Sequence, residues 1–343
     1  MRRGHRLTPV ALGAAMLLAA AADPAPAQDF YRGKTIDIIV ATSPAGGYDQ
    51  YARLLARHMG KHIPGNPNFV VQNMPGAGGI RAANYLFNVA RKDGTVIAII
   101  NRETPLIPLL EPGRAGYQFK SDEFNWIGSP QQEMGLLILN AKSPAQSLAE
   151  LKVKPVAVSG TGPGTAPSVY PLVLNDVLGT KFKVVEGYPG SQEALLAVEN
   201  GEVDGHVSGG SSAAFRGRIN PWVAKGQAKV LMQLGFTKDG AYASAPLVFE
   251  LVQSEKDRQL FELMFTPQVI GRPFLAPPAL PPDRIATLRS AFDKTMKDDE
   301  FLAEARKAQM DVNPVSGEDI HKLLARVFAL PSDLIDRART IVK

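Results

Sequence analysis

The sequence predicts an α/β protein of two lobes, with the second lobe inserted into the first. Its 343 residues correspond to about two domains at roughly 150 residues each. A rhythm of strand, glycine-rich loop and helix runs along the chain twice, and a Pro- and Gly-rich interruption at residues 105–116 separates the two runs. Hydrophobic residues make up 45% and charged residues 21%, a composition typical of globular proteins.

The first 27 residues have the order of an export signal. Three arginines within the first six residues precede an apolar, alanine-rich stretch, and Ala25-Pro26-Ala27 then provides small residues before Gln28. This order predicts a signal peptide over residues 1–27, cleaved after Ala27, and a periplasmic protein. A membrane anchor is the alternative, but the apolar stretch is short for a bilayer span.

The composition of the mature chain excludes several classes. It has 316 residues and a net charge of +3, with no basic run interleaved with aromatic residues, so we expect no nucleic acid partner. The chain contains no cysteine. Disulfides, thiolate metal sites, cysteine nucleophiles and a lipid-bearing N-terminal cysteine are therefore excluded.

The first run of elements predicts a parallel β-α-β-α-β unit. Its helices have apolar residues at helical spacing, and its strands are short apolar runs bounded by Gly, Pro and Asn. The expected strands are Thr35–Val40, Phe69–Gln72 and Val96–Ile100, with helices starting near Asp49 and Ile80. The connections of such a unit are right-handed.

The second run predicts another α/β lobe, and the remainder of the chain is expected to be mainly helical. The expected strands are 136–139, 156–159, 183–186, 203–208 and 229–234. Helix start signals at Pro281-Pro282-Asp283 and Gly317-Glu318 follow. We therefore predict lobe 1 from residues 28–127 and 235–343, and lobe 2 from residues 128–234.

Three glycine loops are candidate ligand sites. Pro44-Ala45-Gly46-Gly47 and Pro75-Gly76-Ala77-Gly78-Gly79 each follow a strand and open a helix, and residues 160–165 repeat the arrangement in lobe 2. The carboxyl edge of an open α/β sheet is where ligands bind, and unpaired N–H groups of a first helical turn attract anions. The alternative is that these loops are only tight turns. A P-loop is excluded, and the third glycine of a dinucleotide fingerprint is missing.

The sequence offers no convincing catalytic or metal-binding set. His58 and His62 are four residues apart, but no glutamate lies between them to act as a base, and a helix end at the surface explains them better. Asp49 is either a general base or an N-cap and brace for the first glycine loop. We therefore predict no enzyme activity, no metal and no cofactor.

Seven segments together resemble the Bug (TctC-like) family, whose members are periplasmic solute receptors of tripartite tricarboxylate transporters. They are Phe30–Ile36, Pro44–Asp49, Asn73–Gly79, Gly162–Thr165, Gly187–Ser191, Asn200–Asp204 and Leu275–Pro278. The resemblance implies a two-lobed periplasmic binding protein of the venus-flytrap type. It also implies a ligand carboxylate held between the two lobe 1 loops by backbone N–H groups and water, and closure of the lobes around it.

Carried over position by position, the resemblance implies a set of ligand-binding residues. They are Ala45, Gly46, Gly47, Tyr48, Asp49, Pro75, Gly76, Ala77, Gly78, Gly79, Gly162, Gly164, Thr165, Asp204 and Ser208. Tyr48 replaces a small residue, so its ring either stacks on the ligand or turns outward. Arg102 stands where the family has a small segment; it either pairs with a second ligand carboxylate or with Glu103 or solvent. Ser208 replaces a family aspartate.

The expected function is that of a monomeric receptor that hands a small organic acid to inner-membrane transporter subunits. The acid is a mono-, di- or tricarboxylate, and a Tyr48 ring that stacks on it would suit an aromatic or hydrophobic acid. One alternative is a secreted α/β hydrolase-like enzyme using Asp49 with His206 or His58 as a base. Another is a sensor that presents the closed lobes to a membrane kinase.

Overall fold

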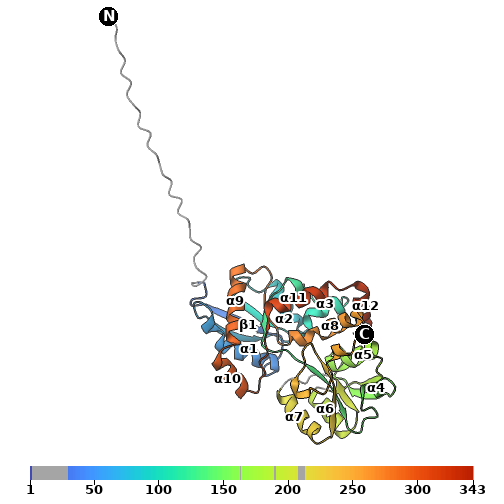
Figure 1. Cartoon of the computed structure of the whole chain (residues 1–343). Coiled ribbons are helices and arrows are strands. Elements are labelled where there is room, and N and C mark those ends of the chain that lie inside the picture. Colours follow the sequence, from blue (N-terminus) through green and yellow to red (C-terminus); the bar gives the residue numbers. More distant parts are fainter. Residues whose placement is uncertain (2–29, 163, 189–190, 208–212, 343) are drawn as a thin grey trace.

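Two β-sheets organise the molecule, one in each lobe. The computed structural model describes residues 1, 30–162, 164–188, 191–207 and 213–342. The predicted signal peptide and its cleavage site, apart from Met1, lie outside these residues, as do Pro163 and Ser208. Figure 1 shows the two lobes side by side, with the C-terminal helix close to the second lobe.

The sheet of lobe 1 has six strands and is mixed. Its order is β11 (Val315–Ser316), β4 (Asn125–Ser129), β10 (Phe274–Ala276), β3 (Val96–Ile99), β1 (Thr35–Val40) and β2 (Asn68–Asn73). β1 lies parallel to both β2 and β3, as the sequence predicts. In contrast, β10 is antiparallel to its neighbours β3 and β4, and β11 is antiparallel to β4. The sequence did not predict the three strands β4, β10 and β11.

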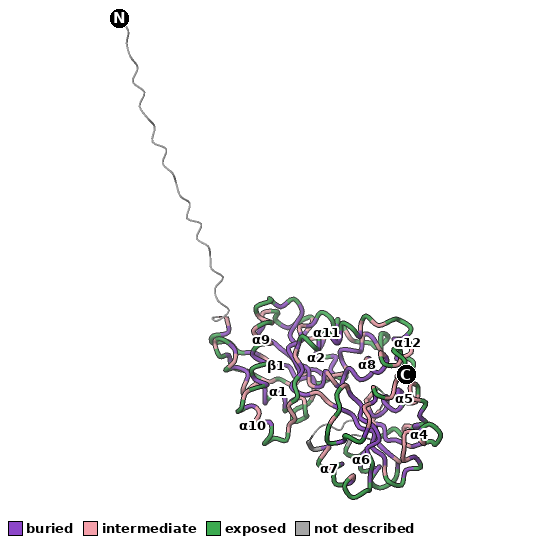
Figure 2. Tube along the Cα trace, viewed as in Figure 1, coloured by how far each residue is buried: buried purple, intermediate pink, exposed green. Residues whose placement is uncertain are grey.

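Helices cover both faces of this sheet because its central strands alternate their side chains between two cores. Ile36, Ile38 and Val40 of β1 point into one core, together with helices α1 (Gly47–His58), α9 (Pro282–Thr295) and α10 (Asp299–Lys307). Ile39 points into the other core, which includes α2 (Ile80–Asn88) and α11 (Gly317–Phe328). Figure 2 shows the central strands buried under these helices.

The sheet of lobe 2 has five strands, in the order β7 (Phe182–Val185), β6 (Val156–Ser159), β8 (Gly205–Val207), β5 (Gly135–Asn140) and β9 (Ala228–Leu234). β6 is parallel to β7 and β8, while β5 is antiparallel to β8 and β9. Helices α6 (Ser191–Asn200) and α7 (Ala213–Ala224) share a core with one face, and α5 (Ala166–Leu178) with the other.

The lobe 2 strands are inserted within the lobe 1 sequence, and the two lobes share part of a core. The chain passes between sheets after Ser129 and returns before Phe274. Tyr170 of α5 packs against Phe265 of α8 (Glu255–Ile270), with ring centroids 4.8 Å apart, and α12 (Ser332–Val342) contacts both helices. We propose the first lobe boundary between Ser129 and Gly135, because the expected boundary at 127/128 falls inside β4.

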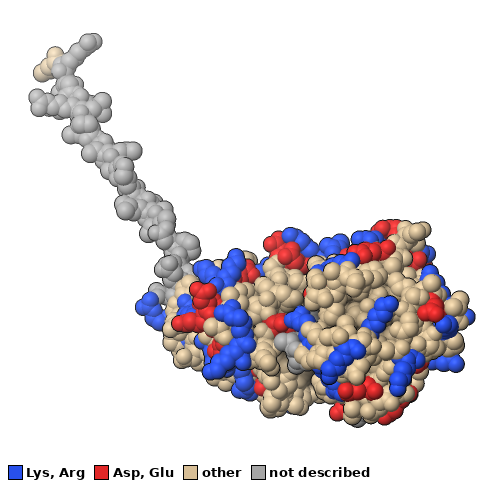
Figure 3. Space-filling model, turned by 60° about the horizontal axis from the view of Figure 1, so that its bottom comes forward, with Lys and Arg blue, Asp and Glu red and all other residues tan. Residues whose placement is uncertain are grey.

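Two short helices complete the element list, α3 (Ile107–Leu110) and α4 (Leu148–Leu151), together with single 3-10 turns at 60–62, 77–79, 104–106, 121–123, 240–242 and 248–250. Across the described part of the chain, every helix is too short or too polar to cross a membrane. Figure 3 shows basic and acidic side chains interspersed over one face of the molecule.

Candidate functional site

The first candidate loop leads from β1 into α1. Its residues 43–47 are exposed, and Gly46 precedes the helix without any side chain that caps the first turn. The N–H groups of a first helical turn have no hydrogen-bond acceptor within the helix, so they can donate to a ligand. Ala45 has a φ of 66°, in the left-handed region that alanine rarely adopts.

The second loop leads from β2 into α2 and lies beside the first, because β1 and β2 are parallel and Val40 pairs with Asn73 at their carboxyl ends. Ala77 also has a left-handed backbone, with a φ of 49°. Gly79 has a φ of 94°, and a Cβ at this position would lie 2.9 Å from the Thr104 hydroxyl. Backbone strain of this kind gathers at functional sites, and here it occurs in both loops.

Asp49 fixes the first loop rather than facing solvent. Its carboxylate accepts hydrogen bonds from the Ala45 amide (2.9 Å), from Arg53 Nε (2.9 Å) and from Asn73 Nδ2 (2.9 Å). Asn73 also donates to the Thr42 carbonyl and thereby connects the two loops. The hydrogen bonds from Arg53 hold the pKa of Asp49 below its ordinary value. Of the two roles considered for Asp49, the structure shows the brace.

The lobe 2 loop is braced by Glu186. The Gly162 amide donates to Glu186 Oε2 (2.9 Å), and the Ser168 hydroxyl donates to the same oxygen (3.0 Å). The Thr165 hydroxyl donates to the Gly162 carbonyl (2.7 Å). A carboxylate of the protein therefore already lies at the start of α5.

Asp204 has a contact within the lobe 2 sheet. Its carboxylate accepts the Ala157 amide at 2.8 Å, one strand away from it. The structure thus gives Asp204 a structural contact, and its role as a ligand contact stays a prediction. The predicted contact Ser208 lies outside the described residues.

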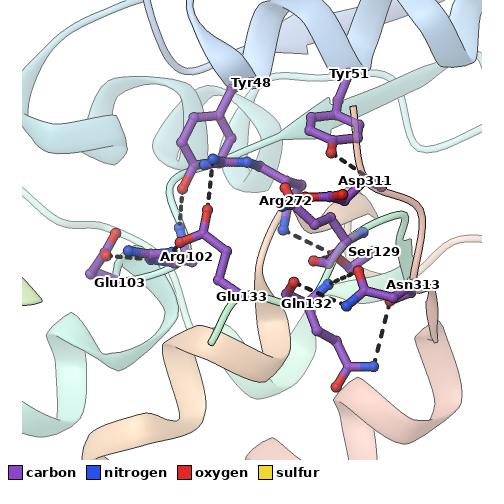
Figure 4. Close-up of polar contacts among 11 residues, drawn as sticks. Tyr48, Tyr51, Arg102, Glu103, Ser129, Gln132, Glu133, Arg272, Asp311 and Asn313 are labelled. Atoms are coloured by element: carbon purple, nitrogen blue, oxygen red, sulfur yellow. Dashed lines mark hydrogen bonds and ion pairs between the residues drawn. The ribbon is translucent and has the colours of Figure 1, made fainter. Parts of the chain in front are cut away.

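Four side chains form a polar cluster below the first loop, which we name the floor cluster: Tyr48, Arg102, Glu133 and Arg272 (Figure 4). Glu133 Oε1 lies 2.7 Å from Arg272 Nη2, and Glu133 Oε2 contacts Arg102 Nη1. The exposed fractions of the side chains are 13% for Glu133, 14% for Arg102 and 19% for Arg272. Both oxygens of one nearly buried carboxylate are therefore used by two guanidinium groups.

Tyr48 holds the same cluster together from above. The Arg272 guanidinium lies 4.4 Å from the centre of the Tyr48 ring, and the Tyr48 hydroxyl accepts the backbone N–H of Arg102 at 3.1 Å. Arg102 also pairs with Glu103 at 2.8 Å. Burial of Arg102 works against its charge, but Glu103 and other neighbours outweigh this and keep its pKa above the ordinary value. The ring and the guanidinium of these two predicted contacts thus have partners within the protein.

Glu133 and Arg272 are members of the floor cluster that sequence reasoning missed. They lie at the two passages between lobes, in segments that match no motif, and they are 139 residues apart in the chain. Only the charge of these two residues could have pointed to the cluster. A single charged residue near a lobe boundary is too common for that.

Two cavities lined by described residues adjoin this region. One of about 350 Å³ is lined by Gln132, Glu133, Met134, Arg216, Phe236, Thr237, Lys238, Asp239, Val269, Asp311, Val312 and Asn313. Arg216 of α7 pairs there with Asp311 of lobe 1 at 2.8 Å, and therefore connects the lobes across it. A smaller cavity, about 60 Å³, lies between Glu103 and Glu111 of lobe 1 and Gly164 of lobe 2, with mainly apolar walls.

The candidate catalytic residues Asp49, His58 and His206 each have partners in a different part of the protein. His206 is fully buried in lobe 2, where its Nδ1 lies 2.9 Å from the Ser159 hydroxyl, and burial lowers its pKa to about 4. His58 pairs with Glu304 of α10 at 2.7 Å. Asp49 is committed to the first loop, so neither histidine is joined to it by a hydrogen bond of the described residues.

One group of potential metal ligands occurs among the described residues, formed by His58, Asp298 and Glu300. Lys61 lies 2.8 Å from Asp298 and 2.6 Å from Glu300. One ammonium group thus already pairs with both carboxylates, and the arrangement joins the end of α1 to the start of α10.

Two α/β lobes, a lobe 2 inserted within lobe 1, and glycine loops at the carboxyl ends of parallel strands define the fold of the periplasmic binding proteins. The chain matches the tripartite tricarboxylate transporter family receptor (TctC) over residues 51–339. It belongs to this family of periplasmic, non-enzymatic solute receptors.

Solved structures share the fold over nearly the whole chain. A TctC solute-binding protein from Polaromonas is 19% identical, with a TM-score of 0.68, over 91% of this chain and 99% of its own. A malate-bound MatC from Rhodopseudomonas palustris is 19% identical (TM-score 0.58), over 91% of this chain and 99% of its own. An adipate-bound protein from the same organism is 16% identical (TM-score 0.56), over 90% and 98%. None of the curated proteins compared with the chain matches it.

Proposed function

We propose that this protein captures a small carboxylic acid between its lobes and delivers it to the membrane subunits of a tripartite transporter. The observation that carries this proposal is the pair of exposed, strained loops at the carboxyl ends of β1 and β2. Asp49 and Asn73 hold the two loops in one geometry through hydrogen bonds within the protein. A preformed cradle avoids part of the ordering cost of binding.

The chemistry of the loops favours an anion. Each loop enters a helix, and the N-terminus of a helix carries partial positive charge and N–H groups without partners. Each such contact contributes about 0.3–1 kcal/mol for an exposed anion and more for a buried one. The malate and adipate bound to two structural relatives support a carboxylate. We propose residues 45–49 and 75–79 as the carboxylate site, with Gly162, Gly164 and Thr165 closing on it.

The proposed place of action is the periplasm, reached through the export signal at residues 1–27. The family assignment supports this location. Edman sequencing or intact mass of the protein purified from the periplasm tests the expected cleavage after Ala27.

The central experiment is a thermal-shift screen of mono-, di- and tricarboxylic and aromatic acids, followed by calorimetry. A ligand at 100 times its Kd adds about 2.7 kcal/mol to the free energy of unfolding, a shift that is readily measured. The ligand released from the protein after the measurement should be chemically unchanged, because a receptor binds its ligand without converting it. If basic or neutral solutes stabilise the protein and no acid does, the carboxylate proposal is wrong.

Gly47→Val is the sharpest variant for the loops. A Cβ at Gly47 would lie 3.4 Å from Arg272 Nη2, the far end of a flexible side chain, so the fold tolerates it while the valine covers the loop amides. We expect loss of acid binding with an almost unchanged melting temperature. Gly217→Val, whose Cβ meets open space, is the matched control. Gly78→Val is less suitable because the φ of 65° at Gly78 would strain a valine.

A further inference from the structure

The floor cluster and the neighbouring Glu103 together carry no net charge. Arg102 and Arg272 provide two positive charges, and Glu133 and Glu103 provide two negative ones. Two guanidinium groups so close together would otherwise be a strong receptor for a carboxylate, because each can donate two parallel hydrogen bonds. Glu133 already takes this position, and it engages both arginines with its two oxygens.

The cluster lies directly beside the proposed carboxylate site. Arg272 is the side chain nearest to the position of a Cβ on Gly47, in the first loop, and its guanidinium stacks on Tyr48 of the same loop. Figure 4 shows Tyr48, Arg272, Glu133 and Arg102 converging on one point below α1. The part of a ligand that extends from the loops toward the lobe boundaries therefore meets this cluster.

The two adjoining cavities also hold several carboxylates. Glu133, Asp239 and Asp311 line the larger cavity, which has Arg216 and Lys238 as its basic residues. Arg216 is already paired with Asp311 and Asp239. Glu103 and Glu111 line the smaller, mainly apolar one. A second anionic group of a ligand that enters either of these two cavities would thus lie near carboxylates.

We infer that Glu133 is the resident carboxylate of the cleft and excludes ligands with a second carboxylate, so that the receptor selects monocarboxylates. This inference rests on the proposed function, because it assumes that the first carboxylate is held by the loops. A second ligand carboxylate would have to displace one that the chain itself tethers beside both arginines, and tethering gives a group a high effective concentration. A methyl, phenyl or hydroxyl end has no such competitor.

The first experiment needs no variant. Calorimetry at pH 7 compares acids of matched size with one and two carboxylates: butyrate with succinate, hexanoate with adipate, and benzoate with terephthalate. At this pH all these carboxyl groups are ionised. We expect at least one pair to bind and, in each pair that binds, the monoacid to bind at least tenfold more tightly.

Glu133→Gln identifies the residue responsible. Removing this charge frees the two guanidinium groups, so we expect the affinity for the diacid to rise at least tenfold while that for the monoacid changes less than threefold. Glu300→Gln is the control, because it removes the same charge from an exposed side chain that pairs with Lys61 outside the floor cluster. We expect its ratio of affinities to equal that of the wild type.

The outcomes separate this inference from the proposed function. A wild-type protein that binds the diacid as tightly as the monoacid, or more tightly, overturns the inference and leaves the carboxylate receptor intact. An unchanged ratio in a folded Glu133→Gln variant assigns the selectivity elsewhere and also overturns it. Binding of neutral or basic solutes with no binding of any acid contradicts the proposed function, and the inference with it.

Discussion

The loops of the two lobes are braced by the same device in two different settings. In lobe 1 the carboxylate of Asp49 accepts the Ala45 amide; in lobe 2 the carboxylate of Glu186 accepts the Gly162 amide. The Asp49 side chain is only 3% exposed and pairs with Arg53, whereas Glu186 is exposed and has no cation partner among the ion pairs of the described residues. One brace is therefore buried and charge-balanced, and the other is open to solvent.

This difference teaches that the lobes contribute differently to binding. A buried, fully bonded carboxylate is costly to move, so the lobe 1 loops keep their geometry with or without a ligand. An exposed carboxylate at a helix N-terminus exchanges easily with water or with another anion. We therefore propose that lobe 1 provides the preformed half of the site and lobe 2 the adjustable half.

The largest expected effect is the loss of stability of lobe 2 at low pH. Lobe 2 keeps His206 neutral and buried, with its pKa lowered to about 4 from an ordinary value near 6.5. The unfolded chain therefore binds a proton that the folded lobe does not bind between these values, and stability falls as the pH falls from 6.5 to 4. The linkage amounts to about 3 kcal/mol for this group. Asp49 behaves differently: its lowered pKa leaves its contribution intact above about pH 4.

The two tryptophans allow each lobe to be followed alone, since Trp126 lies in β4 of lobe 1 and Trp222 in α7 of lobe 2. The Trp126→Phe variant keeps only Trp222, so its fluorescence follows the unfolding of lobe 2. The Trp222→Phe variant keeps only Trp126, so its fluorescence follows the unfolding of lobe 1. In urea unfolding at pH 7, 5.5 and 4 we expect lobe 2 to lose stability first, and His206→Gln to flatten that pH dependence. If the free energy of unfolding of lobe 2 changes with pH equally steeply in the wild type and in His206→Gln, this prediction is wrong.

The second effect tests the brace of lobe 1. Asp49→Ala leaves the Ala45 amide without its acceptor and removes one of the two acceptors of the Asn73 side-chain amide, so we expect a loss of about 2–3 kcal/mol in the free energy of unfolding. Acid binding should weaken by more than tenfold, because the first loop loses its brace and only the Asn73–Thr42 hydrogen bond still connects the two loops. Asp37→Ala is the matched control: Asp37 lies on β1 and pairs with the exposed Arg91. We expect this control to cost less than about 1 kcal/mol.

Much of the fold could be predicted because its parallel units carry local signals. The β1 strand begins and ends at the predicted residues, and α2 and α11 begin where the sequence indicates, since apolar periodicity and glycine loops mark these boundaries. The strands β4, β10 and β11 were missed for a physical reason. They have two to five residues, and they join the sheet by pairing with strands far away in the chain.

The positions of the candidate loops could be predicted from backbone signals, whereas the side-chain cluster that forms across the chain was missed. Glycine loops after strands are visible in any sequence, and the structure places the two lobe 1 loops side by side. Tyr48 was expected to stack on a ligand or to turn outward, but it stacks on Arg272. No local pattern shows that Arg102, Glu133 and Arg272 come together, because they lie in three segments far apart in the chain that meet only in the folded protein.

The smallest expected effect tests the open brace of lobe 2. Glu186→Ala removes a carboxylate that occupies the Gly162 amide and the Ser168 hydroxyl, so these donors become available to the ligand. We expect acid affinity to rise about threefold to tenfold, at a cost below about 1 kcal/mol in the free energy of unfolding because the residue is exposed. Calorimetry and urea unfolding measure the two quantities on one sample. If affinity falls instead, Glu186 holds the loop in its binding geometry as Asp49 does, and the contrast between the two lobes disappears.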